Sequence, residues 1–491
     1  MLFNSVSFLI FFPITTAIYF ALPYRLRWAH LLLASCLFYM AFVPAYILIL
    51  LGTIAVDYVA GLAIESAAGA RRKAFLAMSI AANVGVLAAF KYWDFFGANF
   101  NDLARALHWN YSMGALRMLL PIGLSFHTFQ AMSYTIEVYR GSRGAERQLG
   151  IYALYVMFYP QLVAGPIERP QNLLHQFYEK HDFDYERVAD GLRQMLWGFF
   201  KKLVVADRMS TIADAVFGRP HAFDPGRLLL ATYCFTVQIY CDFSGYSDIA
   251  LGAARVLGFK LMNNFDRPYL AITVAEFWRR WHISLSTWFK DYLYIPLGGS
   301  RAGALRHCRN LLIVFLLSGL WHGASWTFVA WGALHGFYMI THVFTAPLRA
   351  RLSRSVGVSR DSAPVRLVRW FITFNLVAVA WVFFRADNVR QAFWIVSRLA
   401  ENVLHPVEMA SIFHPLPFEQ WGDAFTSKNL GFVMLVFAIA ALVAVLRIRN
   451  KPLERLRTAP LWARWSVYYV IILAILWIGD LGGKSFIYFQ F

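Results

Sequence analysis

The sequence predicts an all-α protein that crosses a lipid bilayer many times, and two features carry this prediction. First, 59% of the 491 residues are hydrophobic and only 15% are charged, whereas soluble proteins average about 25% charged residues. Second, apolar runs of about 18 residues or more recur along the chain, and a helix needs about that length to cross a bilayer. Helices satisfy their own backbone hydrogen bonds in lipid, so each run is expected to be helical.

About eleven such spans follow one another along the chain. The first begins near Ser5 and lacks the features of a cleaved signal peptide, so it is expected to remain as a helix. A shorter segment, 191–205, is interrupted by Lys201 and Lys202 and is expected to be half-buried or re-entrant. The spans are expected at 5–22, 28–42, 45–64, 74–90, 115–134, 151–167, 228–259, 311–344 (long enough for two helices), 370–384, 430–446 and 465–478.

The net charge of +18 raises the question of a nucleic-acid partner. The basic residues stand in short clusters between apolar runs, which is typical of cytoplasmic loops in membrane proteins. We therefore expect a lipid bilayer and no nucleic acid as partner. Two crossings separate the first two clusters, so both are expected on the cytoplasmic side, with the N-terminus outside. The clusters are Arg25 with Arg27, 71–73, Lys201 with Lys202, and 447–451.

The cysteines do not predict a metal site. Cys234 and Cys241 would share a helix face, but no C-x-x-C and no further ligand accompany them. We interpret all four cysteines as small apolar fillers. They are Cys36, Cys234, Cys241 and Cys308.

His322 is the first candidate for chemistry. It lies in a stretch, 311–344, without Asp, Glu, Lys or Arg, and an ionisable group at membrane depth is costly to keep. An imidazole titrates near neutral pH and can therefore move protons. The flanking Gly319 and Gly323 are expected to let another chain or a ligand approach closely. The segment alone leaves two interpretations open: a catalytic group, or a histidine that hydrogen-bonds between helices.

The segment 271–294 is predicted to form one amphipathic helix. Thr273 and Glu276 have the spacing of a capping box, which predicts a helix start. Apolar residues then recur every three or four positions, whereas His282 and three basic residues fall mainly on the other face. On this pattern alone, an anchor at the membrane surface is favoured. The apolar residues are Val274, Phe277, Trp278, Trp281, Leu285, Trp288 and Tyr292, and the basic ones are Arg279, Arg280 and Lys290.

Two carboxylates, Asp242 and Asp248, stand in the otherwise apolar span 228–259. Buried acids in membrane spans usually line polar cavities or pair with cations. Two interpretations stay open: direct participation in chemistry, and pairing with an Arg or Lys of the helix 277–290.

Three motifs follow one another in this part of the chain, and two of them contain one histidine each. They are FWRRWHISLS at 277–286, DYLYIPLGG at 291–299 and GLWHG at 319–323. With these motifs the chain closely resembles the membrane-bound O-acyltransferase (MBOAT) family, and within it the bacterial branch of alginate O-acetylation proteins. His127 departs from that pattern, because an aromatic residue such as Tyr is expected there, and its role is open. Further matching motifs lie at 121–126, 134–140, 161–167 and 381–386, so that the resemblance spans nearly the whole chain.

The resemblance implies a fold and a role for each histidine. The fold is a single domain, 1–491, in which a ring of about eleven transmembrane helices is joined by re-entrant or interfacial helices. Its parts are N-terminal helices in 1–150, a motif-bearing core in 151–345 and C-terminal helices in 346–491. His322 matches the family histidine held to be essential for acyl transfer, and His282 matches a second polar position that carries His or Asn.

These two histidines can divide the work of acyl transfer. A neutral imidazole can take a proton from an acceptor hydroxyl as that hydroxyl attacks a thioester. A second polar group can hold the acyl carbonyl or orient the acceptor. His282 and His322 are 40 positions apart, too far for one helix face, so they would have to meet through the fold.

The resemblance further implies an O-acetyltransferase that crosses the bacterial inner membrane several times. The expected donor is acetyl-CoA or another acetyl thioester on the cytoplasmic side, with no bound cofactor. The expected partners are an exported polysaccharide, alginate before others, and periplasmic acetyltransferase or polysaccharide-modification proteins. Transfer directly to sugar and transfer through such a protein both stay open. The alternatives are a non-catalytic scaffold or transporter, and an acyltransferase for another envelope polymer; the sequence has no internal repeat of the transporter kind.

Overall fold

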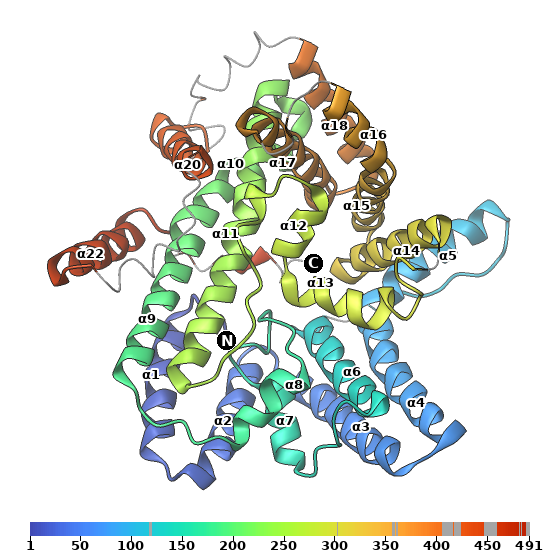
Figure 1. Cartoon of the computed structure of the whole chain (residues 1–491), viewed down its shortest axis with the longest axis vertical. Helices are drawn as coiled ribbons and strands as arrows, with labels where there is room; N and C mark the ends of the chain where they lie inside the picture. The colour runs from blue at the N-terminus through green and yellow to red at the C-terminus, as the bar shows by residue number, and fades with distance from the viewer. Residues whose placement is uncertain are drawn as a thin grey trace. The chain divides into compact units, whose positions relative to one another are not determined.

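The fold is known from a computed structural model, which describes residues 1–116, 120–301, 303–355, 359, 362–404, 416, 424–445, 459–480, 482 and 484–487. Over these residues the chain forms helices and no strand, which confirms the all-α class (Figure 1). The chain groups into two compact units: unit 1 is Met1–Met195 with Tyr246–Asn263, and unit 2 is Leu196–Gly245 with Asn264–Phe491. The expectation of a single domain stays a prediction.

Unit 1 is built on the first predicted spans. Helix α1 begins after Ser5, whose side chain accepts a hydrogen bond from the Phe8 amide. Three of its helices, α3, α4 and α6, pack against one another (Figure 1). The α-helices are α1 (Val6–Ala21), α2 (Tyr24–Met40), α3 (Ile47–Ser66), α4 (Gly69–Leu87), α5 (Trp93–Ala106), α6 (Leu124–Arg140), α7 (Leu149–Met157) and α8 (Pro170–Leu173), with short 3-10 or π-helical turns η1 (Pro44–Tyr46), η2 (Ala88–Tyr92) and η3 (Leu174–Tyr178).

Two predicted spans in unit 1 are shorter than expected. The helix predicted at 115–134 begins only at Leu124, because Gly123 before it has a left-handed φ of 78°; residues 117–119 lie outside the described part. The helix predicted at 151–167 ends at Met157. Pro160 follows three residues later and lacks the amide that would continue the helix, so the chain goes on in turns.

Unit 2 holds the remaining helices, and α9 (Tyr185–Phe199) and α11 (Pro225–Leu257) contribute residues to both units. The span 311–344 forms two helices, α14 and α15, as its length allowed. The other elements are η4 (Phe200–Ala206), α10 (Asp207–Gly218), η5 (Pro220–Ala222), η6 (Pro268–Leu270), α12 (Val274–Arg280), α13 (Ile283–Phe289), η7 (Lys290–Tyr294), α14 (Ala304–His322), α15 (Trp326–Phe344), α16 (Ala346–Ser355), α17 (Ala363–Arg385), α18 (Val389–Leu404), α20 (Ser427–Val445) and α22 (Leu461–Trp477).

Among the described residues, three helical stretches are long and apolar enough to cross a membrane: Pro44–Ser66, Gly69–Ala106 and Ala363–Arg385. Shorter apolar helices are Val6–Ala21, Ser427–Leu442 and Leu461–Trp477. The expected number of about eleven spans and the orientation in the membrane stay predictions. Residues 446–451, with the last predicted basic cluster, lie outside the described part.

One basic cluster was wrongly predicted to lie in a cytoplasmic loop. Lys201 and Lys202 belong to the π-helix η4, and both side chains are buried, Lys202 with 1% of its surface exposed. The segment 191–205 is thus helical throughout, in α9 and η4. The lysines are buried because they have polar partners on α10 and α11, and those on α11 are about 40 positions away in the sequence.

Candidate active site

The first histidine-bearing motif begins as the capping box predicts. The Thr273 side chain accepts a hydrogen bond from the Glu276 amide at 3.0 Å, and Glu276 Oε2 accepts one from the Ile272 amide at 2.9 Å. Helix α12 therefore begins at Val274.

The helix does not continue to 294, and this prediction is wrong. His282 has φ 42° and ψ 56°, a left-handed conformation that separates α12 from α13. Asn264 and Asp266 supply hydrogen bonds at the break: the Asp266 amide donates to Arg280 O at 3.0 Å, and Asn264 O accepts from the Ile283 amide at 2.9 Å. A residue other than glycine is strained in this conformation, and such strain gathers at functional sites.

The break also corrects the predicted position of His282. A continuous helix would place this histidine among the basic residues of the exposed face, but its side chain is fully buried, with 0% exposed. The left-handed residue turns the chain, so that the imidazole points inward with the apolar residues. Trp281 on one side and Ser284 on the other are buried as well.

His322 is the last residue of α14, and the chain then turns into α15. The two helices lie side by side (Figure 1). A Cβ on Gly319 would lie 2.2 Å from the Phe328 carbonyl oxygen, and one on Gly323 would lie 2.1 Å from the Phe328 ring. The predicted close approach at these glycines is therefore made by α15 of the same chain rather than by a ligand or another chain.

The structure brings the two histidines together within unit 2. Their ring centroids lie 6.3 Å apart, so that one substrate can contact both imidazoles. Both imidazoles are buried, His322 with 5% of its surface exposed. Their meeting depends on the break at His282 and on the α14–α15 turn, since neither histidine lies on the other's helix.

Aromatic rings surround the pair. Trp321 lies 5.0 Å from the His322 ring centroid and 6.0 Å from that of His282. Trp331 and Phe384 contact His322 at 5.0 and 5.4 Å. On the other side, Phe243 of α11 stands edge-on to His282 at 4.7 Å. Such apolar surroundings strengthen electrostatic interactions with a substrate.

Among its described residues, unit 2 buries a third histidine, His335, which was not predicted from the sequence. It lies one turn after Trp331 on α15, with 0% of its surface exposed, and its Nδ1 accepts a hydrogen bond from Trp278 Nε1 at 3.3 Å. Its ring also lies 5.0 Å from Trp331. The signal was available, because His335 stands in the same charge-free stretch as His322.

The remaining candidates are placed outside the histidine pair. Asp242 pairs with a cation, as one interpretation held, but the cation is Lys202 at 2.6 Å and not a residue of 277–290. Asp248 accepts a hydrogen bond from Gln194 Nε2 at 3.0 Å. Cys234 and Cys241 are buried and, like the two other cysteines, form no disulfide in the described chain. His127 is buried in α6 of unit 1, and its role stays open.

The fold and this site define a helical membrane protein with a buried pair of histidines suited to proton transfer. Residues 148–380, which include both histidines, match the MBOAT, membrane-bound O-acyltransferase family. Three relatives are similar over most of their length. Probable alginate O-acetylase AlgI of Pseudomonas aeruginosa is 36% identical, over 92% of this chain and 83% of its own. The protein of the same name from Azotobacter vinelandii is 38% identical, over 84% and 83%.

The third relative, the peptidoglycan O-acetyltransferase of Helicobacter pylori, is 36% identical over 80% of this chain and 78% of its own. The chain belongs to the membrane-bound O-acyltransferase family, in its AlgI-like branch, and it is an O-acyltransferase.

Proposed function

We propose that the chain moves an acetyl group from a thioester donor on the cytoplasmic side toward the O-acetylation of an exported polysaccharide. The observation that carries this proposal is the pair of buried imidazoles, 6.3 Å apart, inside the family-matched segment. The protein would act as a multi-pass protein of the bacterial inner membrane, with acetyl-CoA as the first donor to test. The names of the relatives favour alginate as acceptor and peptidoglycan as the alternative.

In the proposed reaction, His322 is the base. It takes the proton from an acceptor hydroxyl while that oxygen forms a bond with the thioester carbonyl carbon. The carbon–sulfur bond then breaks, and the imidazolium returns the proton to the departing thiolate. His282 stabilises the carbonyl oxygen or orients the acceptor, because donors placed at a developing oxyanion lower the barrier. The acceptor hydroxyl belongs either to the sugar itself or to a periplasmic partner that passes the acetyl group on.

The test is His322→Ala, with His322→Gln beside it. Loss of a general base should lower the rate by about 10² to 10⁴, whereas loss of one buried ring should destabilise the protein by about 1–3 kcal/mol at most. Glutamine can hydrogen-bond but cannot act as a base near neutral pH, so it should not restore the rate. The measurement is acetyl transfer from labelled acetyl-CoA to alginate oligosaccharides and to peptidoglycan fragments, per amount of inserted protein.

The alternatives give different results in the same assay. A scaffold or transporter without chemistry would keep near-normal acetylation in both variants. Transfer to peptidoglycan but not to alginate would support the proposed acetyl transfer and would identify peptidoglycan as the acceptor. Polymer export should continue in either variant, because acetylation modifies the chain and does not build it.

A further inference from the structure

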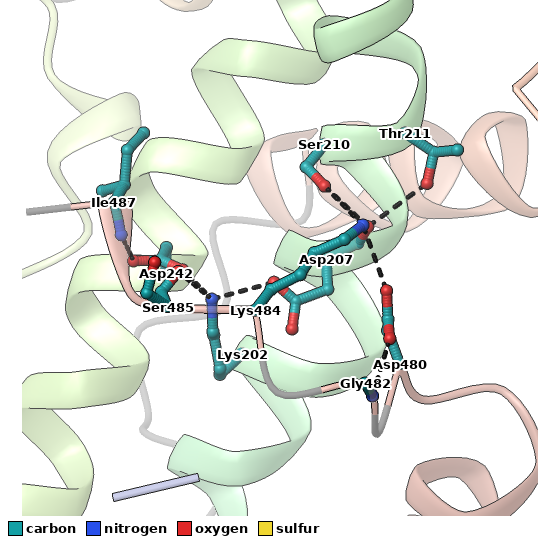
Figure 2. Close-up of polar contacts among 10 residues, drawn as sticks. All are labelled: Lys202, Asp207, Ser210, Thr211, Asp242, Asp480, Gly482, Lys484, Ser485 and Ile487. Carbon is teal, nitrogen blue, oxygen red and sulfur yellow. Dashed lines mark hydrogen bonds and ion pairs between the residues drawn. The ribbon is translucent and has the colours of Figure 1, made fainter. Parts of the chain in front are cut away.

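Unit 2 buries a cluster of charges that the proposed reaction does not use. Lys202 Nζ lies 2.6 Å from Asp242 Oδ1 and 2.8 Å from Asp207 Oδ1, and at most 4% of each side chain is exposed (Figure 2). We call Lys202, Asp207 and Asp242 the Lys202 cluster. Buried ion pairs contribute little net stability, because desolvation offsets their attraction. Such a cluster is therefore better understood through what it holds in place.

The cluster joins η4 to the middle of α11. The π-helical turn lets two consecutive lysines reach α11: Lys201 Nζ donates to Ser244 Oγ at 2.9 Å, and Lys202 binds Asp242. The backbones also approach closely, since a Cβ on Gly245 would lie 2.9 Å from the Gly198 carbonyl oxygen. Residues 242–245 of α11 are thus fixed by side-chain and backbone contacts together.

A distant segment, 484–487, completes the cluster. The Ile487 amide donates to Asp242 Oδ2 at 2.8 Å, so both carboxylate oxygens of Asp242 are occupied (Figure 2). Lys202 Nζ donates to the Ser485 carbonyl at 3.3 Å and lies 4.7 Å from the Phe486 ring centroid. Lys484 reaches the neighbouring helix α10, where Ser210 Oγ accepts a hydrogen bond from it at 3.3 Å.

The residue after Asp242 contacts the candidate site. Phe243 stands edge-on to His282, with ring centroids 4.7 Å apart and an interplanar angle of 87°, and it also packs against Phe265 at 5.1 Å. A shift of α11 at Asp242 would therefore move a ring that confines the His282 imidazole. His282 itself has a left-handed backbone conformation. The direction of its imidazole therefore depends on the side chains that pack against the ring.

We propose that Lys202 and Asp242 are positioning residues for acyl transfer. The pair, completed by the Ile487 amide, holds α11 so that Phe243 keeps the His282 imidazole directed at the substrate. This inference rests on the proposed function, in which His282 takes part in the reaction. According to this proposal, Lys202 and Asp242 affect the rate of acyl transfer through Phe243 and not by contacting His282 themselves.

The test compares Asp242→Ala, Phe243→Leu and the double variant in the acetyl-transfer assay. Asp242→Ala leaves Lys202 paired with Asp207, so no uncompensated charge remains. Each single variant should lower kcat by about tenfold, since small misplacements at a catalytic group are costly, with KM within about twofold. The double variant should be no more than about twofold worse than the poorer single one, because both changes act through the same ring. Asp242→Asn keeps one oxygen, for Lys202, but loses the acceptor of the Ile487 amide, so it should recover only part of the rate.

A matched control is Asp214→Ala. Asp214 belongs to α10 and pairs with Arg385 at 2.9 Å, but half of its side chain is exposed. This variant should keep the wild-type kcat, because exposed pairs contribute little.

Three outcomes would overturn the proposal. Phe243→Leu with a wild-type kcat would remove the link to His282 even if Asp242→Ala failed to accumulate. Losses that multiply in the double variant would show that the two residues act separately, and equal losses in Asp242→Asn and Asp242→Ala would exclude hydrogen-bonded positioning. His282→Ala separates this failure from that of the proposed function: full activity in His282→Ala would contradict the proposed function itself.

Discussion

Each unit buries polar side chains between its helices, and the Asp57 network of unit 1 differs from the histidine pair of unit 2 in what surrounds the polar groups. In unit 1, Asp57 on α3 accepts hydrogen bonds from Ser79 Oγ at 2.6 Å and from Asn83 Nδ2 at 2.9 Å, both on α4. Ser79 Oγ also lies 3.1 Å from Thr135 Oγ1 on α6. Neutral donors thus hold the carboxylate and connect three helices.

In unit 2, the rings around His282 and His322 are aromatic. Aromatic rings exclude water, which strengthens the electrostatic interactions between an imidazole and a substrate. In unit 1, by contrast, the buried carboxylate accepts its hydrogen bonds from side chains of the neighbouring helix α4. Burial alone therefore does not distinguish the candidate site from the Asp57 network, whereas the surroundings of the buried groups do.

The largest expected effect comes from disturbing the packing that holds His322. In Gly319→Ala the new methyl group would lie 2.2 Å from the Phe328 carbonyl oxygen, and backbone cannot yield as a side chain can. Helices α14 and α15 must therefore move apart at Gly319, three positions before His322. Because this displaces the His322 imidazole, we expect about 10²-fold lower acetyl transfer per inserted protein. Gly52→Ala in α3 is the control, because nothing lies within 4 Å of its Cβ. Activity of Gly319→Ala within about threefold of wild type would contradict this account of the turn.

A smaller effect, on stability and not on rate, is expected in unit 1. Asp57→Ala removes the carboxylate bound by two buried donors, and Ser79 Oγ then keeps only Thr135 Oγ1 while Asn83 Nδ2 keeps only the Ser79 carbonyl. This loss should lower the free energy of unfolding by about 1–3 kcal/mol. Thermal unfolding in detergent measures this loss, and Asp57→Asn should lose less because it keeps one acceptor oxygen. Acetyl transfer per folded protein should stay within about twofold of wild type. A fall in kcat at normal thermal stability would place Asp57 in the chemistry and erase the contrast between the Asp57 network and the histidine pair.

The sequence predicted the helical class and singled out His322 because both depend on local signals, and the catalytic role of His322 stays a prediction. Apolar length identifies a helix, and a stretch without charges makes His322 conspicuous. The same signal would have found His335. The break at His282 was missed because the apolar repeat continues through it, and the hydrogen bonds that allow the break come from Asn264 and Asp266 in another segment.

The Lys202 cluster was missed for a related reason. Lys202 and Asp242 are 40 positions apart, and Ile487 follows Asp242 by 245. No periodicity connects positions so distant, so the lysines looked like loop charges. Only the fold shows that Lys202 binds the Asp242 carboxylate and the Ser485 carbonyl inside the protein.

The smallest effect is expected from the distant segment 484–487, and it measures how far this segment contributes to acyl transfer. Ile487→Pro removes the amide hydrogen that Asp242 Oδ2 accepts, whereas Ile487→Ala keeps it. Both variants lose the buried Ile487 side chain, so the difference in kcat between them measures the lost amide hydrogen together with the fixed φ of proline. Because Lys202 still binds Asp242, we expect kcat about three- to fivefold lower for the proline variant than for the alanine variant, with KM unchanged, as a small shift at a positioning group would give. Equal kcat values for the two variants would mean that α11 is held by Lys202 alone. The segment 484–487 would then resemble the Asp57 network, as a connection between helices with no influence on the imidazoles, and the positioning role would rest on Lys202 and Asp242.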